Sequence, residues 1–316
     1  MKKISYYFLS VILLSSFLQA QKLSVLETVK VTDPSQGEFY FPKMSPDGSK
    51  LFFTSAGYKG LWYYDMQTKK IVPFTEEPGA GYEYQFSGDS KSVYYRVNNF
   101  DKNGLRLSQS MIQKNIAAKK RQVLETSSEL SAPRMLMGSK LAYTSNNKIV
   151  LKETAAALRK SNTQKALSDA AVYIEDQKLV LYSNGSKKTM TPLGEGSYIW
   201  PSLSPDGTRI LCTEVRKGTF ISDLDGNVLV NLGSEMASPK WSPDGKWITY
   251  MVERDNGVEY TASDIYAVSS DGRQKIQLTA TDGTLEMYPE WGPDGKSILF
   301  HSDKGAIYLM KLKNEQ

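Results

Sequence analysis

The chain has 316 residues, of which 40% are hydrophobic and 23% charged, and its formal net charge is +5. This hydrophobic content is enough to bury one large core or a ring of smaller ones. The charge excess is small and the Lys and Arg residues are scattered, which argues against nucleic acid as a partner.

The first 20 residues form a segment of their own. Lys2 and Lys3 precede an apolar run from Ile4 to Leu18, and Leu18-Gln19-Ala20 is an acceptable cleavage site. Because the apolar run is short for a membrane span, the pattern predicts a secretory signal peptide over residues 1–20. We therefore expect a periplasmic or secreted monomer that has no transmembrane segment after cleavage.

The single cysteine, Cys212, lies in the middle of an apolar run. It has no partner for an internal disulfide, and its distance from the leader excludes a lipoprotein anchored through cysteine. A buried, inert thiol is expected.

A four-residue turn with fixed flanks recurs along the rest of the chain. Ser-Pro-Asp-Gly occurs at 45–48, 204–207 and 242–245, and Gly-Pro-Asp-Gly at 292–295. In each copy a Pro stands three residues before the turn, and a basic residue followed by alternating apolar residues comes after it. Pro and Asp favour chain reversal, Gly accepts the left-handed backbone, and the alternation predicts a half-buried strand. The unit is therefore a repeated β-hairpin.

The Pro that precedes each turn limits where its strand can lie. Proline cannot donate to a sheet ladder, so this strand must have a free edge. The innermost strand of a β-propeller blade borders the central channel and has such an edge. Weaker copies of the repeat follow Ser87 and Gly138.

The two ends of the chain are expected to share one blade. The first repeat predicts four strands, whereas the last supplies three, at 288–291, 297–301 and 306–312, before the sequence ends. The strand at 22–31 has no partner nearby. Pairing it with the last blade would close the ring and remove an open sheet edge.

The number of blades stays open between six and seven. Residues 153–193 lack the Pro-Asp-Gly turn but contain three short strand-like runs. Dividing roughly 295 mature residues by about 42 per repeat gives seven blades, whereas a single insertion at 153–193 would give six. The expected division is a signal peptide at 1–20, a closing strand at 21–37 and a propeller of four-stranded blades at 38–316.

These repeats, over about residues 38–313, resemble the TolB-type propeller repeat. The resemblance implies an all-β, TolB-like β-propeller, with six blades more often than seven. It also implies a protein of the cell envelope whose propeller binds other proteins. TolB carries an α/β domain ahead of its propeller for which this chain has no room, so only the propeller resemblance carries over.

A propeller's function normally lies at the mouth of its channel. The residues that lead into the inner strands are aromatic and acidic, and exposed Tyr and Trp side chains are common anchors of binding surfaces. Trp200, Trp241 and Trp291 are expected to pack between blades, and the long loop around Arg254 could carry contacts. The candidate binding residues are Glu38, Tyr40, Tyr82, Tyr84, Tyr198, Arg254, Glu286, Tyr288 and Glu290.

Sequence motifs for metal binding or catalysis are weak or missing. His301 is the single histidine, so a multi-histidine metal site is impossible, and the run Asp223–Asn227 fits a turn better than a calcium loop. The sequence has no Gly-x-Ser-x-Gly nucleophile motif. We therefore expect no cofactor, no metal and no catalytic residue.

Two hypotheses follow from the sequence. The first is an exported, non-catalytic propeller that binds a protein or peptide in the bacterial envelope. The alternative is a carbohydrate-binding or glycan-cleaving propeller that uses carboxylates of the channel mouth, namely Glu38, Glu83, Glu286 and Glu290.

Overall fold

The structure is a computed structural model, and the signal peptide predicted at 1–20 lies outside the residues that it describes. Within the described part of the chain, no helix is long and apolar enough to cross a bilayer. The described residues are 22–136, 140–146, 148–154, 170–183 and 185–315.

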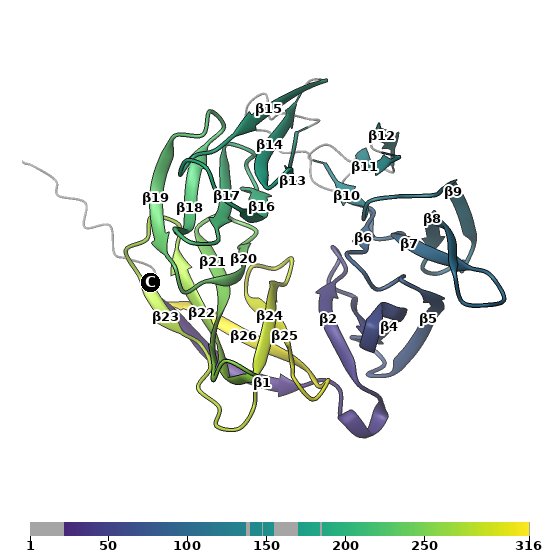
Figure 1. Ribbon diagram of the computed structural model, residues 1–316. Helices are drawn as coiled ribbons and strands as arrows, with labels where there is room; N and C mark the ends of the chain where they lie inside the picture. The colour runs from purple at the N-terminus through teal and green to yellow at the C-terminus, as the bar shows by residue number, and fades with distance from the viewer. Residues whose placement is uncertain (1–21, 137–139, 147, 155–169, 184, 316) are drawn as a thin grey trace, which may run out of the picture.

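The described residues form seven antiparallel sheets arranged in a ring (Figure 1). This arrangement is a seven-bladed β-propeller, so the predicted all-β propeller is confirmed and the blade number is seven. Five sheets have four strands and two have three. The two helical elements are single 3₁₀ turns, η1 (Pro34–Gln36) and η2 (Ala56–Tyr58).

The first three blades follow one another along the chain. Blade 1 contains β2 (Phe39–Met44), β3 (Lys50–Ser55), β4 (Lys59–Asp65) and β5 (Ile71–Pro78). Blade 2 contains β6 (Gln85–Phe86), β7 (Ser92–Phe100), β8 (Arg106–Asn115) and β9 (Arg121–Ser127). Blade 3 contains β10 (Arg134–Met135), β11 (Lys140–Ser145) and β12 (Lys148–Glu153).

Three further blades continue the ring. Blade 4 contains β13 (Ala171–Glu175), β14 (Lys178–Ser183) and β15 (Ser186–Met190). Blade 5 contains β16 (Tyr198–Leu203), β17 (Arg209–Glu214), β18 (Gly218–Asp223) and β19 (Val228–Gly233). Blade 6 contains β20 (Ala237–Trp241), β21 (Trp247–Asp255), β22 (Tyr260–Ser269) and β23 (Lys275–Gln277).

Blade 7 is built from both ends of the chain. Its strand order is β1-β26-β25-β24, and β1 pairs antiparallel with β26 from Lys22 opposite Glu315 to Lys30 opposite Tyr308. Figure 1 shows the N-terminal strand lying beside the C-terminal one. The predicted closure is confirmed. The strands are β1 (Lys22–Lys30), β24 (Glu286–Trp291), β25 (Ser297–Ser302) and β26 (Ile307–Glu315).

The recurring turn owes its shape to a hydrogen-bonded serine and aspartate. In blade 6, Ser242 Oγ donates to Asp244 Oδ1 at 2.6 Å and accepts the backbone N–H of Trp247 at 2.9 Å. Gly245 closes the turn with φ of 68°, a conformation that glycine adopts without a Cβ clash. The turns that begin at Ser45, Ser87 and Ser204 repeat these two serine bonds. The serines are therefore structural parts of the turn.

The prolines of the inner strands lie at β-bulges on sheet edges, as their chemistry requires. The ladder between β2 and β3 shifts register across Phe41 and Pro42, and β16, β20 and β24 shift at their own prolines. Each of these strands stands at one end of its sheet. The bulge turns the preceding residue out of the ladder and toward the channel.

Buried apolar clusters fill the contacts between six pairs of neighbouring blades. No such cluster of described residues lies between blades 3 and 4. A cavity of about 710 Å³ lies at this seam, with Leu151 on one side and Tyr173 on the other, and it reaches the channel, where Trp200 and Lys240 line it as well.

Blade 4 differs from the others in which of its strands are described. Tyr198 N donates to Gln177 O in the β13–β14 turn at 2.9 Å, just as Phe39 N donates to Gly305 O in the β25–β26 turn at 2.8 Å. Because β25 and β26 are the second and third strands of blade 7, β13 and β14 hold the second and third places in blade 4. The innermost place of blade 4 is not taken by any described strand.

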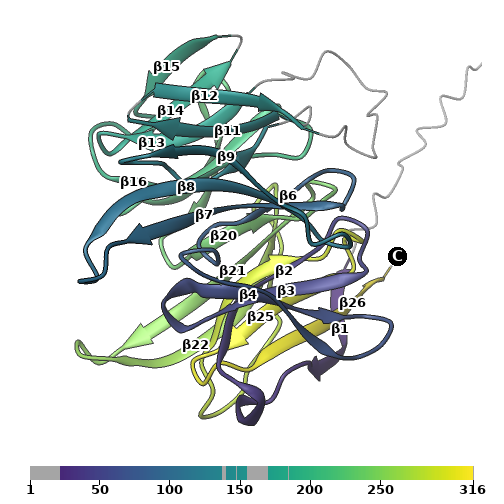
Figure 2. The same ribbon diagram turned by 90° about the vertical axis from the view of Figure 1, so that its right-hand side faces the viewer.

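The two faces of the ring differ in relief. The hairpins β7–β8 and β21–β22 extend from the same face, and the C-terminal end of β26 lies on the opposite one (Figure 2). The Pro-Asp-Gly turns share the face of the C-terminus, since Leu312 N donates to Lys296 O at 2.8 Å. The face with the long hairpins is called the hairpin face below.

Candidate channel-mouth binding site

A cavity of about 270 Å³ lies in the channel, where the inner strands of several blades converge. Its walls come from the bulged positions of β2, β16, β20 and β24, from blades 2 and 3, and from η2. Second-to-third strand turns such as η2 lie on the hairpin face, so the cavity opens toward that face. The lining residues are Phe41, Pro42, Lys43, Tyr58, Gly81, Tyr82, Glu83, Tyr84, Gln85, Pro133, Arg134, Trp200, Ser238, Lys240, Tyr288 and Glu290.

Besides Tyr58 of η2, whose φ is 57°, five lining residues have a left-handed backbone that is unusual outside glycine. Their φ angles lie between 49° and 53°, and four of the five directly precede an inner-strand proline. Such a conformation costs on the order of 1–3 kcal/mol per residue, and it concentrates at functional sites. The bulge thus gives four of these blades one shared way of presenting a side chain to the channel, whereas Glu83 lies in the loop before β6, whose ladder shows no register shift. The five residues are Phe41, Glu83, Trp200, Ser238 and Tyr288.

A belt of aromatic rings runs along the mouth of this cavity. Ring centroids are 5.1 Å apart between Tyr82 and Tyr58, 5.1 Å between Tyr58 and Phe41, and 4.8 Å between Phe41 and Tyr288. Tyr288 also stacks on His301 at 5.4 Å. Edge-to-face and offset ring pairs of this kind hold one another in place, so the belt is a preformed surface.

Trp200 departs from the expectation that it packs between blades. Its side chain is 40% exposed and lines the cavity, whereas Trp291 is 7% exposed and belongs to the core. The left-handed backbone at Trp200 explains the difference, because it turns the indole out of the ladder. An exposed Trp beside a cavity is a typical anchor of a binding surface.

Charged groups occupy the deeper wall of the cavity. Lys240 Nζ lies 3.6 Å from Glu290 Oε2, and Arg134 Nη2 lies 3.9 Å from Glu83 Oε2. Lys43 Nζ donates to the backbone oxygen of Tyr84 at 3.2 Å and lies 5.2 Å from the centre of the Tyr84 ring.

Burial lowers the pKa of Lys43 below its ordinary value of 10.5. Glu290 and Glu83 oppose this shift, while the neighbouring cations Lys240 and Arg134 add to it. The five charged groups therefore form one electrostatic cluster within the channel.

The structure brings four of the sequence-predicted residues to the cavity and places the others elsewhere. Tyr82, Tyr84, Tyr288 and Glu290 line it, although Tyr84 itself is fully buried. The remaining five do not line it; they are Glu38, Tyr40, Tyr198, Arg254 and Glu286.

Glu38, Tyr40 and Arg254 lie outside the cavity wall. Glu38 is exposed and accepts a hydrogen bond from Tyr40 Oη at 3.2 Å, and the Tyr40 ring packs edge-on against His301. Arg254 is exposed near the end of β21, in the projecting hairpin of the same face.

Tyr198 and Glu286 are buried in the body of the propeller. Tyr198 belongs to the core between blades 4 and 5, where its hydroxyl donates to Gly194 O at 2.7 Å. Glu286 is 4% exposed, and its Oε2 has no hydrogen-bond partner among the described residues. Burial raises the pKa of Glu286 against the opposing hydrogen bonds of Thr281 and Thr279.

Sequence reasoning missed several cavity residues that share one positional signal. They stand immediately before or after a proline that lies in an inner strand or directly precedes one. Phe41 and Trp200 precede such a proline, and Lys43, Arg134 and Lys240 follow one. Tyr58 was also missed; it comes from η2, and no motif marked it.

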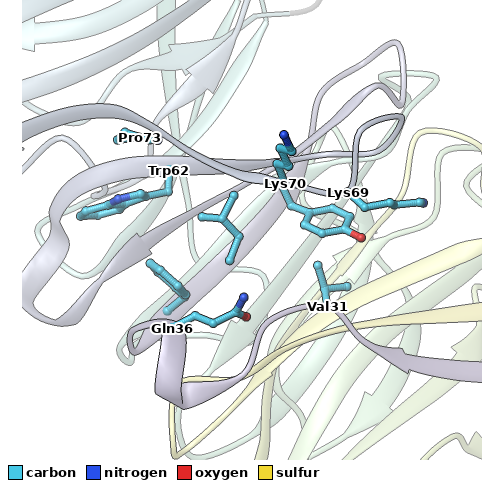
Figure 3. A pocket seen from close by; sticks show the side chains of 9 residues that line it. Val31, Gln36, Trp62, Lys69, Lys70 and Pro73 are labelled. Atoms are coloured by element: carbon cyan, nitrogen blue, oxygen red, sulfur yellow. The ribbon is translucent and has the colours of Figure 1, made fainter.

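A second surface pocket, of about 660 Å³, lies on the flank of the ring rather than in the channel. Trp62, Gln36 and Val31 surround it, with Lys69 and Lys70 at its rim (Figure 3). It lies between blade 1 and the segment that follows β1, and no sequence-predicted site residue lines it.

Within the described residues, no three His, Cys, Asp or Glu side chains gather closely enough to hold a metal ion. No step through a metal is derived for this site. Cys212 is buried, and burial raises the pKa of its thiol to about 12, so the thiol is unreactive as expected.

Fold and site together define a seven-bladed β-propeller with an aromatic and charged cavity at the hairpin face of its channel. No protein-family model matches the sequence. A segment of 111 residues is 29% identical to the uncharacterized peptidase YuxL of Bacillus subtilis. This match covers 31% of the chain and 16% of the peptidase.

Solved propellers resemble the chain in fold. TolB from Acinetobacter baumannii is 19% identical with a TM-score of 0.47, over 78% of this chain and 55% of TolB. An oligogalacturonate lyase in complex with manganese is 16% identical with a TM-score of 0.48, over 86% of this chain and 76% of the lyase. An oligogalacturonate lyase from Vibrio parahaemolyticus is 13% identical with a TM-score of 0.50, over 92% of this chain and 96% of the lyase. At these identities the likeness concerns the fold alone.

Proposed function

We propose that this chain is a non-catalytic β-propeller that binds a segment of a protein or peptide at the hairpin-face mouth of its channel. The observation that carries the proposal is the set of five left-handed residues, all of which line one cavity. Strained backbone conformations that recur in five blades and line the same cavity are typical of a binding site.

The lining chemistry suits an extended peptide. Aromatic side chains supply apolar contact area at low entropy cost, and the charged wall supplies hydrogen-bond donors and acceptors. A cavity of this size takes a few side chains of a partner rather than a whole domain. We propose a partner in the bacterial envelope because the first 20 residues predict a signal peptide for export. This part of the proposal rests on the sequence alone.

Selection of a random heptapeptide display library on the immobilised mature protein tests this function. We expect enriched peptides whose binding falls about tenfold or more in Trp200→Ala, because an exposed aromatic anchor is removed. Leu229→Ala is the matched control, since Leu229 is 53% exposed on the outer strand β19 of the same blade. Equal enrichment on both variants, or none on the wild type, contradicts the proposal.

A glycan-cleaving or glycan-binding propeller is the second candidate, because Glu83 and Glu290 line the same cavity as Trp200. Glycoside cleavage requires one carboxyl group that stays protonated beside one that is ionised. Burial raises the pKa of Glu286, one of the four carboxyl groups predicted for this role, but Glu286 is outside the cavity. Glu38 is likewise outside it. Release of reducing ends from envelope glycans that disappears in Glu290→Gln would favour this candidate over the first.

A further inference from the structure

The channel cavity carries more positive than negative charge. Three cations and two carboxylates line it among the described residues, and four of these charged groups act on the fifth, Lys43. The cations are Lys43, Arg134 and Lys240, and the carboxylates are Glu83 and Glu290.

The two ion pairs in the cavity are long and solvent-accessible. The pair of Lys240 and Glu290 spans 3.6 Å with side chains 42% and 30% exposed. The pair of Arg134 and Glu83 spans 3.9 Å with side chains 44% and 47% exposed. Exposed pairs of this length contribute little to stability, so Lys240 and Arg134 can turn toward another anion at small cost.

Lys43 is the cation that has no carboxylate partner among the described residues. Its ammonium group carries three donors, and the structure gives it one carbonyl oxygen and one aromatic face. The side chain is half-buried and lines the cavity. An incoming anion would form a charge-assisted hydrogen bond there in an environment with weak screening.

We propose that the channel recognises a carboxylate of its peptide partner, with Lys43 as the anchor and Lys240 and Arg134 as the flanking cations. This inference rests on the proposed function and specifies the chemistry of the bound segment. The carboxylate belongs to an acidic side chain or to the end of a peptide chain.

The aromatic belt favours a peptide over an acidic sugar as the source of this carboxylate. Tyr58 and Tyr82 meet at an interplanar angle of 87°, and Phe41 and Tyr288 at 62°. The faces and edges of these rings contact one another, whereas a sugar ring is bound by an open, flat aromatic face. Peptide side chains pack against such tilted edges readily.

Lysine-directed NMR tests the inference with defined probes. The lysines of the mature protein are ¹³C-dimethylated, which keeps their charge, and the Lys43 signal is assigned with Lys43→Gln. Acetyl-Tyr-Ala-Glu-amide is titrated against its neutral isostere acetyl-Tyr-Ala-Gln-amide, and acetyl-Tyr-Ala-Ala with a free carboxyl end against its amide. We expect either carboxylate peptide to shift the Lys43 signal and raise its pKa, because an opposite charge favours the ammonium form.

Variants separate anchoring from general charge. Lys43→Gln should weaken binding of the carboxylate peptides by about tenfold or more, the loss expected for a hydrogen bond between charged groups. Arg134→Gln should weaken it less, and it supplies an independent test should Lys43→Gln fail to fold. Lys296→Gln, an exposed lysine of a Pro-Asp-Gly turn on the opposite face, should leave binding unchanged.

The outcomes distinguish this inference from the proposed function. Equal binding of the Glu and Gln peptides at the channel would overturn the carboxylate inference and leave peptide binding standing. A Lys43 shift with galacturonic acid but with neither peptide would also overturn it, in favour of an acidic sugar. Failure of the display library to yield any ligand that depends on Trp200 would remove the proposed function itself.

Discussion

At the scale of single residues, the inner-strand proline determines which side chains reach the channel. Proline interrupts the ladder, the bulge forms around it, and the residues on either side of it leave the regular alternation. Phe41 and Lys43 flank Pro42 in this way, and Tyr288 and Glu290 flank Pro289. One covalent constraint thus gives each of these two blades a pair of side chains that line the channel.

His301 is predicted to make stability depend on pH. It is 3% exposed, its Nδ1 lies 3.0 Å from Ser302 O, and its Nε2 has no partner among the described residues. Burial lowers the pKa of His301 from 6.5 to about 4. The unfolded chain therefore binds a proton at a higher pH than the folded one, and stability is lost as pH falls from about 6.5 toward 4. The loss is about 3 kcal/mol at most.

Chemical unfolding of the wild type and His301→Gln at pH 7.5 and pH 5 measures this effect. The free energy of unfolding of the wild type, relative to that of the variant, should fall between pH 7.5 and pH 5. The reason is that the glutamine of the variant does not titrate, whereas the imidazole does. A constant difference between them would show that His301 does not contribute to the pH dependence.

Glu286 is predicted to act with the opposite sign. Burial raises the pKa of its carboxyl group, so the folded state holds a proton that the unfolded state releases. Stability is therefore present at low pH and lost as pH rises through the raised pKa. The neutral variant Glu286→Gln should gain stability relative to the wild type at pH 8, and this gain should shrink at pH 4.5. Glu259→Gln, at an exposed position of the β21–β22 hairpin, is the matched control and should behave as the wild type does.

At the scale of elements, the Pro-Asp-Gly turn and the bulge account for most of the hairpin geometry. The turn residues occur at a fixed spacing and bond locally, so the sequence predicts them well. The hairpin predicted around the turn at 45–48 agrees with β2 and β3 because alternation and turn indicate the same register. The strand-like runs within 153–193 correspond to β13, β14 and β15. No Pro-Asp-Gly turn in this stretch indicates a separate blade.

Ser242→Ala is predicted to destabilise the protein by about 1–3 kcal/mol, the cost of an unsatisfied buried donor. Ser242 is 2% exposed, and its hydroxyl accepts the backbone N–H of Trp247, a residue that is itself only 4% exposed to solvent. Ser234→Ala, at an exposed position between β19 and β20, should change the free energy of unfolding by less than about 0.5 kcal/mol. Equal effects of the two substitutions would show that the serine bond does not stabilise the turn.

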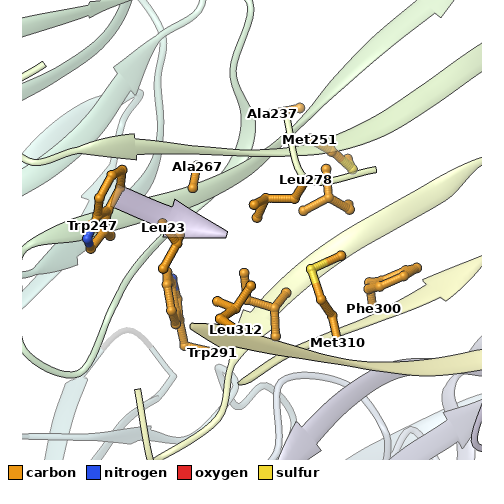
Figure 4. Close-up of a cluster of buried hydrophobic side chains, with 12 residues drawn as sticks. Leu23, Ala237, Trp247, Met251, Ala267, Leu278, Trp291, Phe300, Met310 and Leu312 are labelled. Carbon is orange, nitrogen blue, oxygen red and sulfur yellow. The ribbon is translucent and has the colours of Figure 1, made fainter. Parts of the chain in front are cut away.

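At the scale of the whole molecule, the ring is held closed by a pairing between the two ends of the chain. β1 covers the outer edge of β26, and this contact joins residues separated by almost the full length of the sequence. Without it, β26 would expose an open edge that can pair with another chain. Closure also seats Leu23 in the core between blades 6 and 7 (Figure 4).

Leu23→Ala is predicted to lower the free energy of unfolding by about 2–5 kcal/mol. Leu23 is 2% exposed and belongs to the cluster that contains Trp247, Trp291 and Leu312 (Figure 4), so truncation leaves a cavity at the closure. Leu26→Ala is the control on the same strand, because Leu26 is 62% exposed and its loss should cost less than about 0.5 kcal/mol. Denaturant unfolding compares the two, and similar losses would mean that β1 does not close the ring through its buried face.

Local chemistry determined the parts of this protein that a short stretch of sequence specifies. The hairpin turns, the edge position of the prolines and the unpaired strands at the two ends could all be read from residue type and spacing, and together they define a propeller. Which residues meet in the channel is a different matter, because Lys43, Arg134 and Lys240 come from three blades. Their convergence depends on how many blades close the ring and on where each bulge turns its side chain. Only the tertiary structure decides both, since the contacts involved join residues that are far apart in the chain.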